Sequence, residues 1–262
     1  SAGGNTINYN GAHDQLIKDP VASTYYHLRV SDSGVKHLQQ DVLVNGHLTI
    51  DSAILKSNHQ TIHLQGNWNN AGGVFEEDSG RVILAGSVDQ YIRLSASEQF
   101  YNLEVNKSGS SVFADAPVTV SYTLHMLDGN LHTSDTLTLG ADTAHTGVLA
   151  HSSGTIIGQF ERWIDRPEVW YTFPVGTSTH HRPLRVTFRE LKSKGSVAAG
   201  FIGLNPGTAG LLSLSEEDSL CIDSIFNEGY WTFVNKHTLA SGNYRLEANA
   251  SGVDSQNLLP DT

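Results

Sequence analysis

The sequence predicts an all-β protein, with a parallel β-helix (β-solenoid) over residues 1–158 and a β-sandwich module over residues 159–262. Three observations lead to this prediction. Short apolar–polar alternations recur along the chain and are separated by Gly, Asn, Asp and Ser. One strand pattern is written twice, about 75 positions apart. A composition shift, with clustered Trp and Pro, begins near Gly158.

The composition is typical of a turn-rich β protein. Charged residues make up 16% of the 262 residues, which is low for a globular protein, and the net charge is −11. No basic stripe is present, which argues against a nucleic-acid partner and against an anionic membrane surface. No apolar run is long enough to span a bilayer, so no membrane insertion is predicted. Cys221 is the only cysteine, so no internal disulfide can form.

The duplicated pattern pairs TYYHLRVS (24–31) with QFYNLEVN (99–106). Leu28 then matches Leu103, and the apolar residues alternate with polar ones, which places one side chain in and the next out. Strands this short cannot bury an apolar face alone, whereas stacked coils can. We therefore predict coils of about 20 to 30 residues. A β-sandwich built from two duplicated halves is the alternative.

A second stretch repeats with a shift of one position. DVLVNGHLTIDSAIL (41–55) aligns with PVTVSYTLHMLDGNL (117–131). The alternation predicts that the later copy buries one apolar side made of Val118, Val120, Tyr122, Leu124 and Met126.

Residues 66–92, followed by FYNLEVNKSG and VTVSYTLHMLDGNLHTSDTLTLG, resemble the β-helical repeats of large secreted surface proteins of Bacteroidetes, which are type IX secretion substrates. That family pattern has a Gly-x-Trp strand, an apolar strand ending in Gly, a Gln-x-Ile strand and a Phe-Tyr-Asn-Leu strand. The matching positions here are Trp68, Gly86, Gln90, Ile92, Phe100, Asn102 and Leu103. The first copy departs from the pattern, because His27 stands where the family has Asn. The resemblance covers about 150 residues and implies an extracellular or cell-surface location, but no single activity.

Residues 159–262 predict further strands at 169–175, 184–188, 197–201, 228–235 and 243–250. They resemble the module that follows the β-helix in the same surface proteins, through FPVG (173–176), RPL (182–184), NPG (205–207) and EGYW (228–231). That module is usually longer in the family. We therefore expect the sandwich to be incomplete, or to be completed by another chain at an open strand edge.

The groups that could carry chemistry do not form a recognisable catalytic set. The acidic triplets 76–78 and 216–218 are poor carboxylate pairs, because neighbours on a strand point to opposite faces. Calcium at Asp78 or Asp218 is a metal option, although no full oxygen-ligand loop is present. His180 and His181 are expected in a polar loop. We predict no catalytic residue, no metal site and no cofactor.

Two kinds of surface site are predicted. Proteins of the resembled group carry O-glycans on Asp-Ser/Thr-apolar triplets, which implies candidate glycosylation at Ser52, Thr136, Thr143, Ser219 and Ser224. Aromatic platforms for carbohydrate would use Trp68, Trp163 and Trp170, with burial in the core as the alternative.

These observations predict a non-catalytic, secreted, cell-surface structural or adhesive protein that serves as a stalk or filament component. Its expected partners are surface glycans or other copies of the same protein. The alternative is a carbohydrate-binding module, or a carbohydrate-active β-helix enzyme such as a polysaccharide lyase or hydrolase. The enzyme would need convergent carboxylates and basic residues on one face of the coils.

Overall fold

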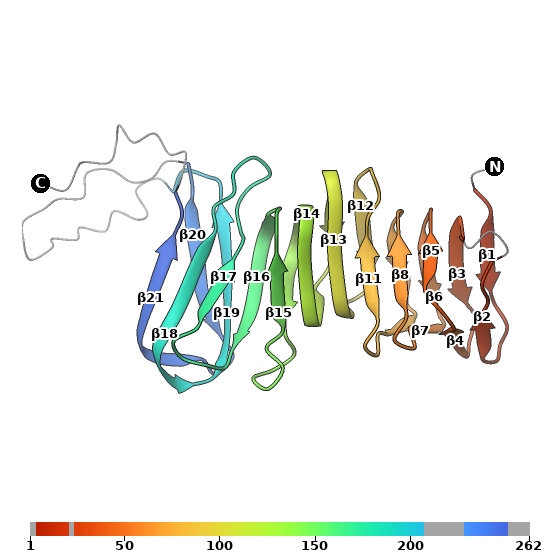
Figure 1. Ribbon diagram of the computed structural model, residues 1–262, viewed down its shortest axis with the longest axis horizontal. Helices are drawn as coiled ribbons and strands as arrows, with labels where there is room; N and C mark the ends of the chain where they lie inside the picture. The colour runs from red at the N-terminus through yellow and green to blue at the C-terminus, as the bar shows by residue number, and fades with distance from the viewer. Residues whose placement is uncertain (1–3, 21–23, 207–227, 251–262) are drawn as a thin grey trace, which may run out of the picture.

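The computed structural model describes residues 4–20, 24–206 and 228–250. Every regular element in these residues is a β-strand, so the predicted all-β class is confirmed. The described part of the chain holds no helix long and apolar enough to cross a membrane. The N-terminal part is a β-solenoid of about 7 turns. Figure 1 shows the strands of successive turns side by side along the long axis, with the antiparallel strands at the far end from the N-terminus.

Each turn of the solenoid has three sides, and the strands of each side pair in parallel with those of the next turn. The first side contains β5 (Val42–Val44), β8 (Thr61–Leu64), β11 (Arg81–Leu84), the middle of β13 (Glu98–Ala114) and β14 (Val118–Leu139), and β15 (Val148–His151). The second side contains β1 (Thr6–Tyr9), β3 (His27–Ser31), β6 (Leu48–Asp51), β9 (Trp68–Asn70), β12 (Gln90–Leu94), the later parts of β13 and β14, and the start of β16 (Ile156–Ile164). The third side contains β2 (Gln15–Ile17), β4 (Val35–Leu38), β7 (Ile54–Lys56) and β10 (Val74–Glu76) in the early turns. In the later turns the start of β13 pairs in parallel with the start of β14, and the end of β14 pairs in parallel with β16.

The apolar core follows from the period-two alternation. Leu28 of β3 pairs with Leu48 of β6, and Leu48 pairs with Trp68 of β9, one turn of 20 residues further on. All three side chains are buried, as are their neighbours at every second position. Full burial of a large apolar side chain contributes about 1.5–3 kcal/mol, so a column that continues through every turn stabilises the whole solenoid.

Side chains at the corners tie each turn to the next. The Nδ1 atom of His27 accepts a hydrogen bond from the backbone N–H of His47 (2.8 Å), and Nδ1 of His47 accepts one from the N–H of Asn67 (2.9 Å). In the following turn Oδ1 of Asn67 accepts from the N–H of Tyr91 (3.0 Å). Backbone donors that the corner removes from the sheet are thereby satisfied.

The two copies of the duplicated pattern lie on different sides of the solenoid. Leu28 belongs to the second side, whereas Leu103 pairs with Val82 and Leu124 on the first side. An offset of 75 residues is not a whole number of turns of about 20. Both strands bury their apolar residues in the same core, because every side imposes the same inward–outward alternation.

One predicted core residue is wrong. Val118, Val120, Leu124 and Met126 are buried as expected, but Tyr122 is 51% exposed. The pairing of β13 with β14 shifts register between Phe100 and Asn102, where the chain turns from one side to the next. Tyr122 lies in this corner, where β14 has one residue more than β13, so its side chain faces outward and stacks on Tyr101 with ring centroids 5.0 Å apart.

The C-terminal part changes from parallel to antiparallel pairing at β16. This strand pairs in parallel with β14 and in antiparallel fashion with β19 (Gly195–Ile202), which pairs in turn with β20 (Tyr230–Lys236). A second antiparallel sheet contains β17 (Trp170–Phe173), β18 (Leu184–Ser193) and β21 (Ala240–Ala248). Phe173 of this sheet packs edge-on against Phe160 and Phe233 of the first. The predicted sandwich is supported in part by this antiparallel sheet.

Candidate functional site

Trp68 does not provide a carbohydrate platform. Its side chain is fully buried and makes edge-to-face contacts with Phe75 (4.8 Å) and Phe100 (5.1 Å). The indole Nε1 donates a 2.9 Å hydrogen bond to Oε2 of Glu98, and Nδ2 of Asn70 donates to the same oxygen at 2.9 Å. Burial raises the pKa of Glu98. The carboxyl group is closed off in the core and has no access to a large substrate.

The described glycosylation candidates lie where a modifying enzyme could reach them. Ser52 is exposed in the turn after β6 and has a positive φ of 62°. Thr136 and Thr143 are partly exposed. Ser219 and Ser224 lie outside the described residues, as do Cys221, Asp218 and the triplet 216–218.

The acidic triplet 76–78 forms ion pairs and a hydrogen bond with the preceding turn. Oε2 of Glu76 lies 3.0 Å from Nζ of Lys56, and Oδ1 of Asp78 lies 3.6 Å from the same ammonium group. Oδ2 of Asp78 accepts from the backbone N–H of Asn58 at 3.1 Å. Within the described ranges, no group of three His, Cys, Asp or Glu side chains is placed to hold a metal ion.

A carboxylate with basic neighbours lies on the outward face of the first side. Glu104 is 5% exposed although it points away from the core, because the neighbouring side chains of Arg81 and His125 flank it. Arg81 donates to Oε2 of Glu104, and Nδ1 of His125 lies 3.0 Å from the same oxygen. Arg81, Glu104 and His125 come from three successive turns, so only the coil register brings them together.

A second cluster joins the solenoid to the antiparallel strands. Ser196 of β19 is fully buried, and its hydroxyl donates to Glu161 of β16 and lies 2.7 Å from Nδ1 of His237. In a serine nucleophile triad the acid and the serine contact opposite ring nitrogens of the histidine. Here Glu161 and Ser196 both contact Nδ1, and no attacking group is accessible. The cluster therefore acts as a structural tie.

Trp163 and Trp170 are the two partly exposed tryptophans among the predicted platforms. Trp163 packs against the His237 ring at 4.5 Å. Trp170 lies under two guanidinium groups, those of Arg185 (4.4 Å) and Arg245 (5.7 Å). Neither arginine was predicted from the sequence, since they are 60 positions apart and the register of β18 with β21 alone places them together.

Two lysines are completely buried at solenoid corners. Nζ of Lys36 donates to the carbonyl oxygens of Gly11 (2.6 Å) and His13 (3.2 Å). Nζ of Lys107 donates to the carbonyl oxygen of Val88 (2.6 Å) and to Oε1 of Gln90 (2.7 Å). Burial lowers the pKa of Lys107 to about 8. Both ammonium groups thus close turns whose carbonyl groups would otherwise lack donors.

A polar hollow of about 480 Å³ lies where the solenoid meets the antiparallel strands. It is lined by stacked turns at 109–111, 128–130 and 153–155 and by the loop 177–181. As predicted, His180 and His181 lie in this polar loop. His181 contacts the hydroxyl of Thr155 at 3.0 Å, and burial together with nearby His151 lowers its pKa.

Comparison with known proteins identifies no relative: no family model, no curated protein and no solved structure matches the chain.

Proposed function

We propose that the protein is a non-catalytic, secreted, cell-surface structural or adhesive protein whose solenoid serves as a stalk or filament component. One observation carries the proposal: ionisable side chains that could take part in catalysis instead form hydrogen bonds between successive turns. Lys107 closes a corner, Glu98 holds the indole of Trp68, and His27 holds the backbone of the next turn. Hydrogen bonds of this kind between turns resist separation of the turns, which suits a mechanical role.

The antiparallel part serves, in this proposal, as a β-sandwich module at the end of the stalk. The aromatic contact between Phe160 and Phe173 (5.8 Å) supports the packing of one sheet on the other. The outward side chains of the second sheet then form a surface for glycans or for another copy of the chain. The resemblance of residues 66–92, 100–109 and 118–140 to secreted Bacteroidetes repeats supports the cell-surface location.

Glycosylation belongs to the same proposal. Ser52, Thr136 and Thr143 have exposed or partly exposed positions in Asp-Ser/Thr-apolar triplets. We expect hexose-containing additions on peptides with these residues when the protein is isolated from its source. Peptide mass spectrometry that finds all three unmodified would remove this part of the proposal.

The second candidate function is a polysaccharide lyase or hydrolase. The outward cluster of Arg81, Glu104 and His125 favours it, because it combines a carboxylate with basic groups on one face of the coils. A glycosidase needs two carboxyl groups about 5 to 10 Å apart. In the outward cluster Glu104 is the single carboxylate, and its Oε2 contacts Arg81 and His125 instead of facing a second carboxyl group.

The two functions separate in one experiment. The full chain is incubated with a panel of plant and algal polysaccharides, and both retention of polymer and release of shorter or unsaturated products are measured. We expect retention without product. Product released by the wild-type protein and lost in Glu104→Gln would establish the enzyme and refute the structural assignment. Electron microscopy of the same sample shows whether the chain forms filaments or remains as single stalks.

A further inference from the structure

The outward face of the second antiparallel sheet carries a regular grid of side chains. Alternate residues of β18, such as Leu184 and Val186, are buried in the core, so the residues between them face outward. The strand register then sets two cross-strand rows, Thr172–Arg185–Glu247 and Trp170–Thr187–Arg245.

The grid holds its two guanidinium groups in fixed positions. Both lie over the ring of Trp170, and both bind the same carboxylate. Nε of Arg185 donates to Oε2 of Glu247 at 2.7 Å, and a terminal nitrogen of Arg245 lies 2.7 Å from Oε1. One carboxylate therefore balances two guanidiniums, and each guanidinium has five N–H donors. The side chains of Arg185 and Arg245 are 50% and 60% exposed, so unused donors and one positive charge face solvent.

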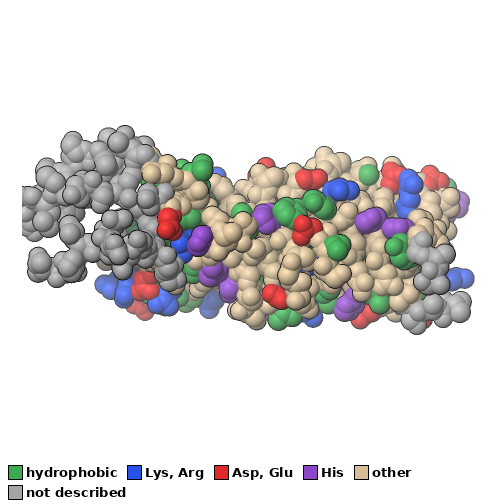
Figure 2. All heavy atoms as spheres, turned by 90° about the horizontal axis from the view of Figure 1, so that it is seen from above, with side chains coloured by type: hydrophobic (Ala, Val, Ile, Leu, Met, Phe, Trp, Pro, Cys, Tyr) green, Lys and Arg blue, Asp and Glu red, His purple; other side chains and the backbone are tan. Residues whose placement is uncertain are grey.

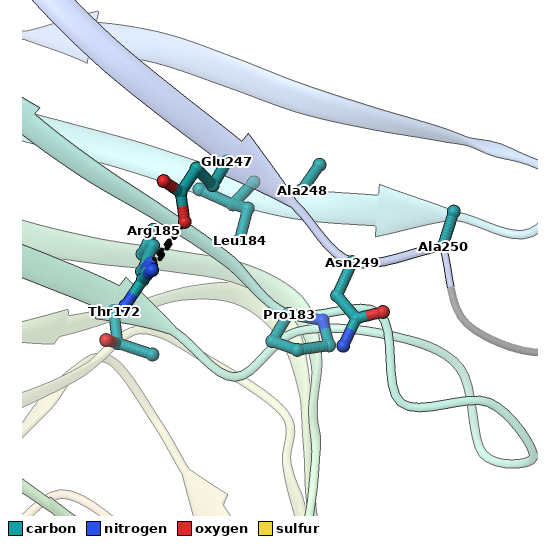
Figure 3. A pocket seen from close by; sticks show the side chains of 8 residues that line it. All are labelled: Thr172, Pro183, Leu184, Arg185, Glu247, Ala248, Asn249 and Ala250. Atoms are coloured by element: carbon teal, nitrogen blue, oxygen red, sulfur yellow. Dashed lines mark hydrogen bonds and ion pairs between the residues drawn. The ribbon is translucent and has the colours of Figure 1, made fainter.

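A hollow of about 470 Å³ opens beside the first row, as Figure 3 shows. Arg185 and Glu247 lie at one end of it, while Pro183, Ala248 and Ala250 provide small apolar surfaces. Its volume lies within the range of about 300–1,000 Å³ that is usual for small-molecule sites. A sugar ring, which has one more polar and one more apolar face, fits along these residues with its charged group at Arg185.

Basic side chains are more frequent in the antiparallel part of the chain than in the solenoid. The described residues of the solenoid, 4–20 and 24–158, hold seven basic and fifteen acidic side chains, a net charge of −8. Residues 159–262 hold nine basic and twelve acidic side chains, a net charge of −3. Figure 2 shows basic side chains gathered, with acidic ones among them, at the end with the antiparallel strands.

We propose that this face and the adjoining hollow bind the uronate units of an acidic polysaccharide, with Arg185 contacting the carboxylate. The planar guanidinium fork matches a carboxylate in two-bond geometry, and Trp170 keeps that fork oriented. The patch is small and the rest of the chain is acidic, which disfavours a long polyphosphate such as nucleic acid. This inference rests on the proposed adhesive function and names the ligand of its terminal module.

Calorimetric titration of the full chain with de-esterified oligogalacturonate tests the inference. We expect saturable binding that weakens as salt is raised and that disappears with the methyl-esterified oligomer, which has the same rings without the charge. Arg185→Gln should weaken binding about tenfold or more, since a charge-assisted hydrogen bond is lost. Arg29→Gln, an arginine on the solenoid with similar exposure, is the matched control and should leave binding unchanged.

Glu247→Gln keeps the inference testable if Arg185→Gln does not fold. Removal of the competing carboxylate frees both guanidiniums, so uronate binding should strengthen several-fold, whereas a purely structural cluster gives no binding in either protein. Absence of binding to the wild type, equal binding of the methyl ester, preference for a sulfated oligosaccharide or for single-stranded DNA, or weaker binding by Glu247→Gln each overturns the inference. Retention of neutral polysaccharides without product would leave the proposed function in place, so the two failures are distinguishable.

Discussion

Lys107 donates a 2.7 Å hydrogen bond from its Nζ to Oε1 of Gln90, inside a corner from which both side chains are closed to solvent. Gln90 itself accepts from the N–H of Gly86 at 2.8 Å and donates to the carbonyl oxygen of Leu64 at 3.0 Å. A cation without a carboxylate partner thus holds together carbonyl groups of neighbouring turns. This arrangement makes the solenoid sensitive to pH above neutrality.

The stability of the wild type relative to Lys107→Met should rise at alkaline pH. Burial lowers the pKa of folded Lys107 to about 8, whereas the unfolded value is about 10.4. Between these values the unfolded chain binds more protons, so raising the pH relieves the burial penalty, by about 2 kcal/mol from pH 7 to 9.5. Urea unfolding of both proteins at the two pH values measures this. A constant difference would refute a low pKa for Lys107.

Glu98 should give the opposite pH dependence. Because burial raises its pKa in the folded protein, the folded state binds more protons above about pH 4.3, and stability falls as pH rises through the folded pKa. Glu98→Gln cannot ionise, so its stability relative to the wild type should be higher at pH 7 than at pH 4.5. Glu98→Ala leaves Nε1 of Trp68 and Nδ2 of Asn70 without an acceptor and should cost about 1–3 kcal/mol. Chemical denaturation of the wild type, Glu98→Gln and Glu98→Ala measures the three free energies of unfolding.

The two tryptophans Trp68 and Trp170 should respond very differently to truncation. Trp68 is fully buried among aromatic rings, so Trp68→Ala should reduce the free energy of unfolding by about 3–5 kcal/mol. Trp170 lies on an outward face under two guanidiniums, and Trp170→Ala should cost about 1 kcal/mol. Thermal or urea unfolding distinguishes them, and similar losses would contradict the placement of one of the rings.

Stacked glycine turns provide a matched pair of substitutions. A Cβ on Gly154 would lie 2.0 Å from the carbonyl oxygen of Gly129 in the previous turn, and its φ is +88°. Gly154→Ala should therefore cost about 3 kcal/mol or more. Gly109 has a φ of +72° but open space around its Cβ position, so Gly109→Ala should cost only about 1–2 kcal/mol. Equal effects would mean that the turns are not in contact.

The corner histidines should make the solenoid acid-sensitive. Nδ1 of His47 accepts a backbone hydrogen bond, and burial followed by the charge of His27 lowers the pKa of His47. The folded state therefore binds fewer protons around pH 6, and stability falls as the pH drops through this range. His47→Asn should keep the acceptor, as Asn67 does in the next turn, and lose the acid sensitivity. Unfolding curves at pH 7.5 and 5.5 measure this, and an unchanged pH slope in His47→Asn would count against it.

Prediction from the sequence was correct where the geometry of a single strand, with its in–out alternation of side chains, decides burial. The alternation of Val118, Val120, Leu124 and Met126 correctly indicated a buried strand side, because a pleated strand enforces it locally. The prediction failed at Tyr122 because this residue lies in a corner between two sides, and the position of that corner depends on the pairing with the neighbouring strand. Trp68 could not be assigned to core or surface, since an indole suits either.

The sequence by itself determined the class of the molecule: short alternating strands and turn residues require an all-β chain, and their repetition favours stacked turns over a β-sandwich. Only the tertiary structure decided which distant residues meet. Arg81 and His125 both reach Glu104 because turns of about 20 residues place them in the rungs on either side of it. Arg185 and Arg245 share Glu247 because antiparallel pairing of β18 with β21 folds 60 residues back on themselves. The physical reason is that alternation is set by the geometry of a single strand, whereas register is set by the length of every turn and loop between two strands.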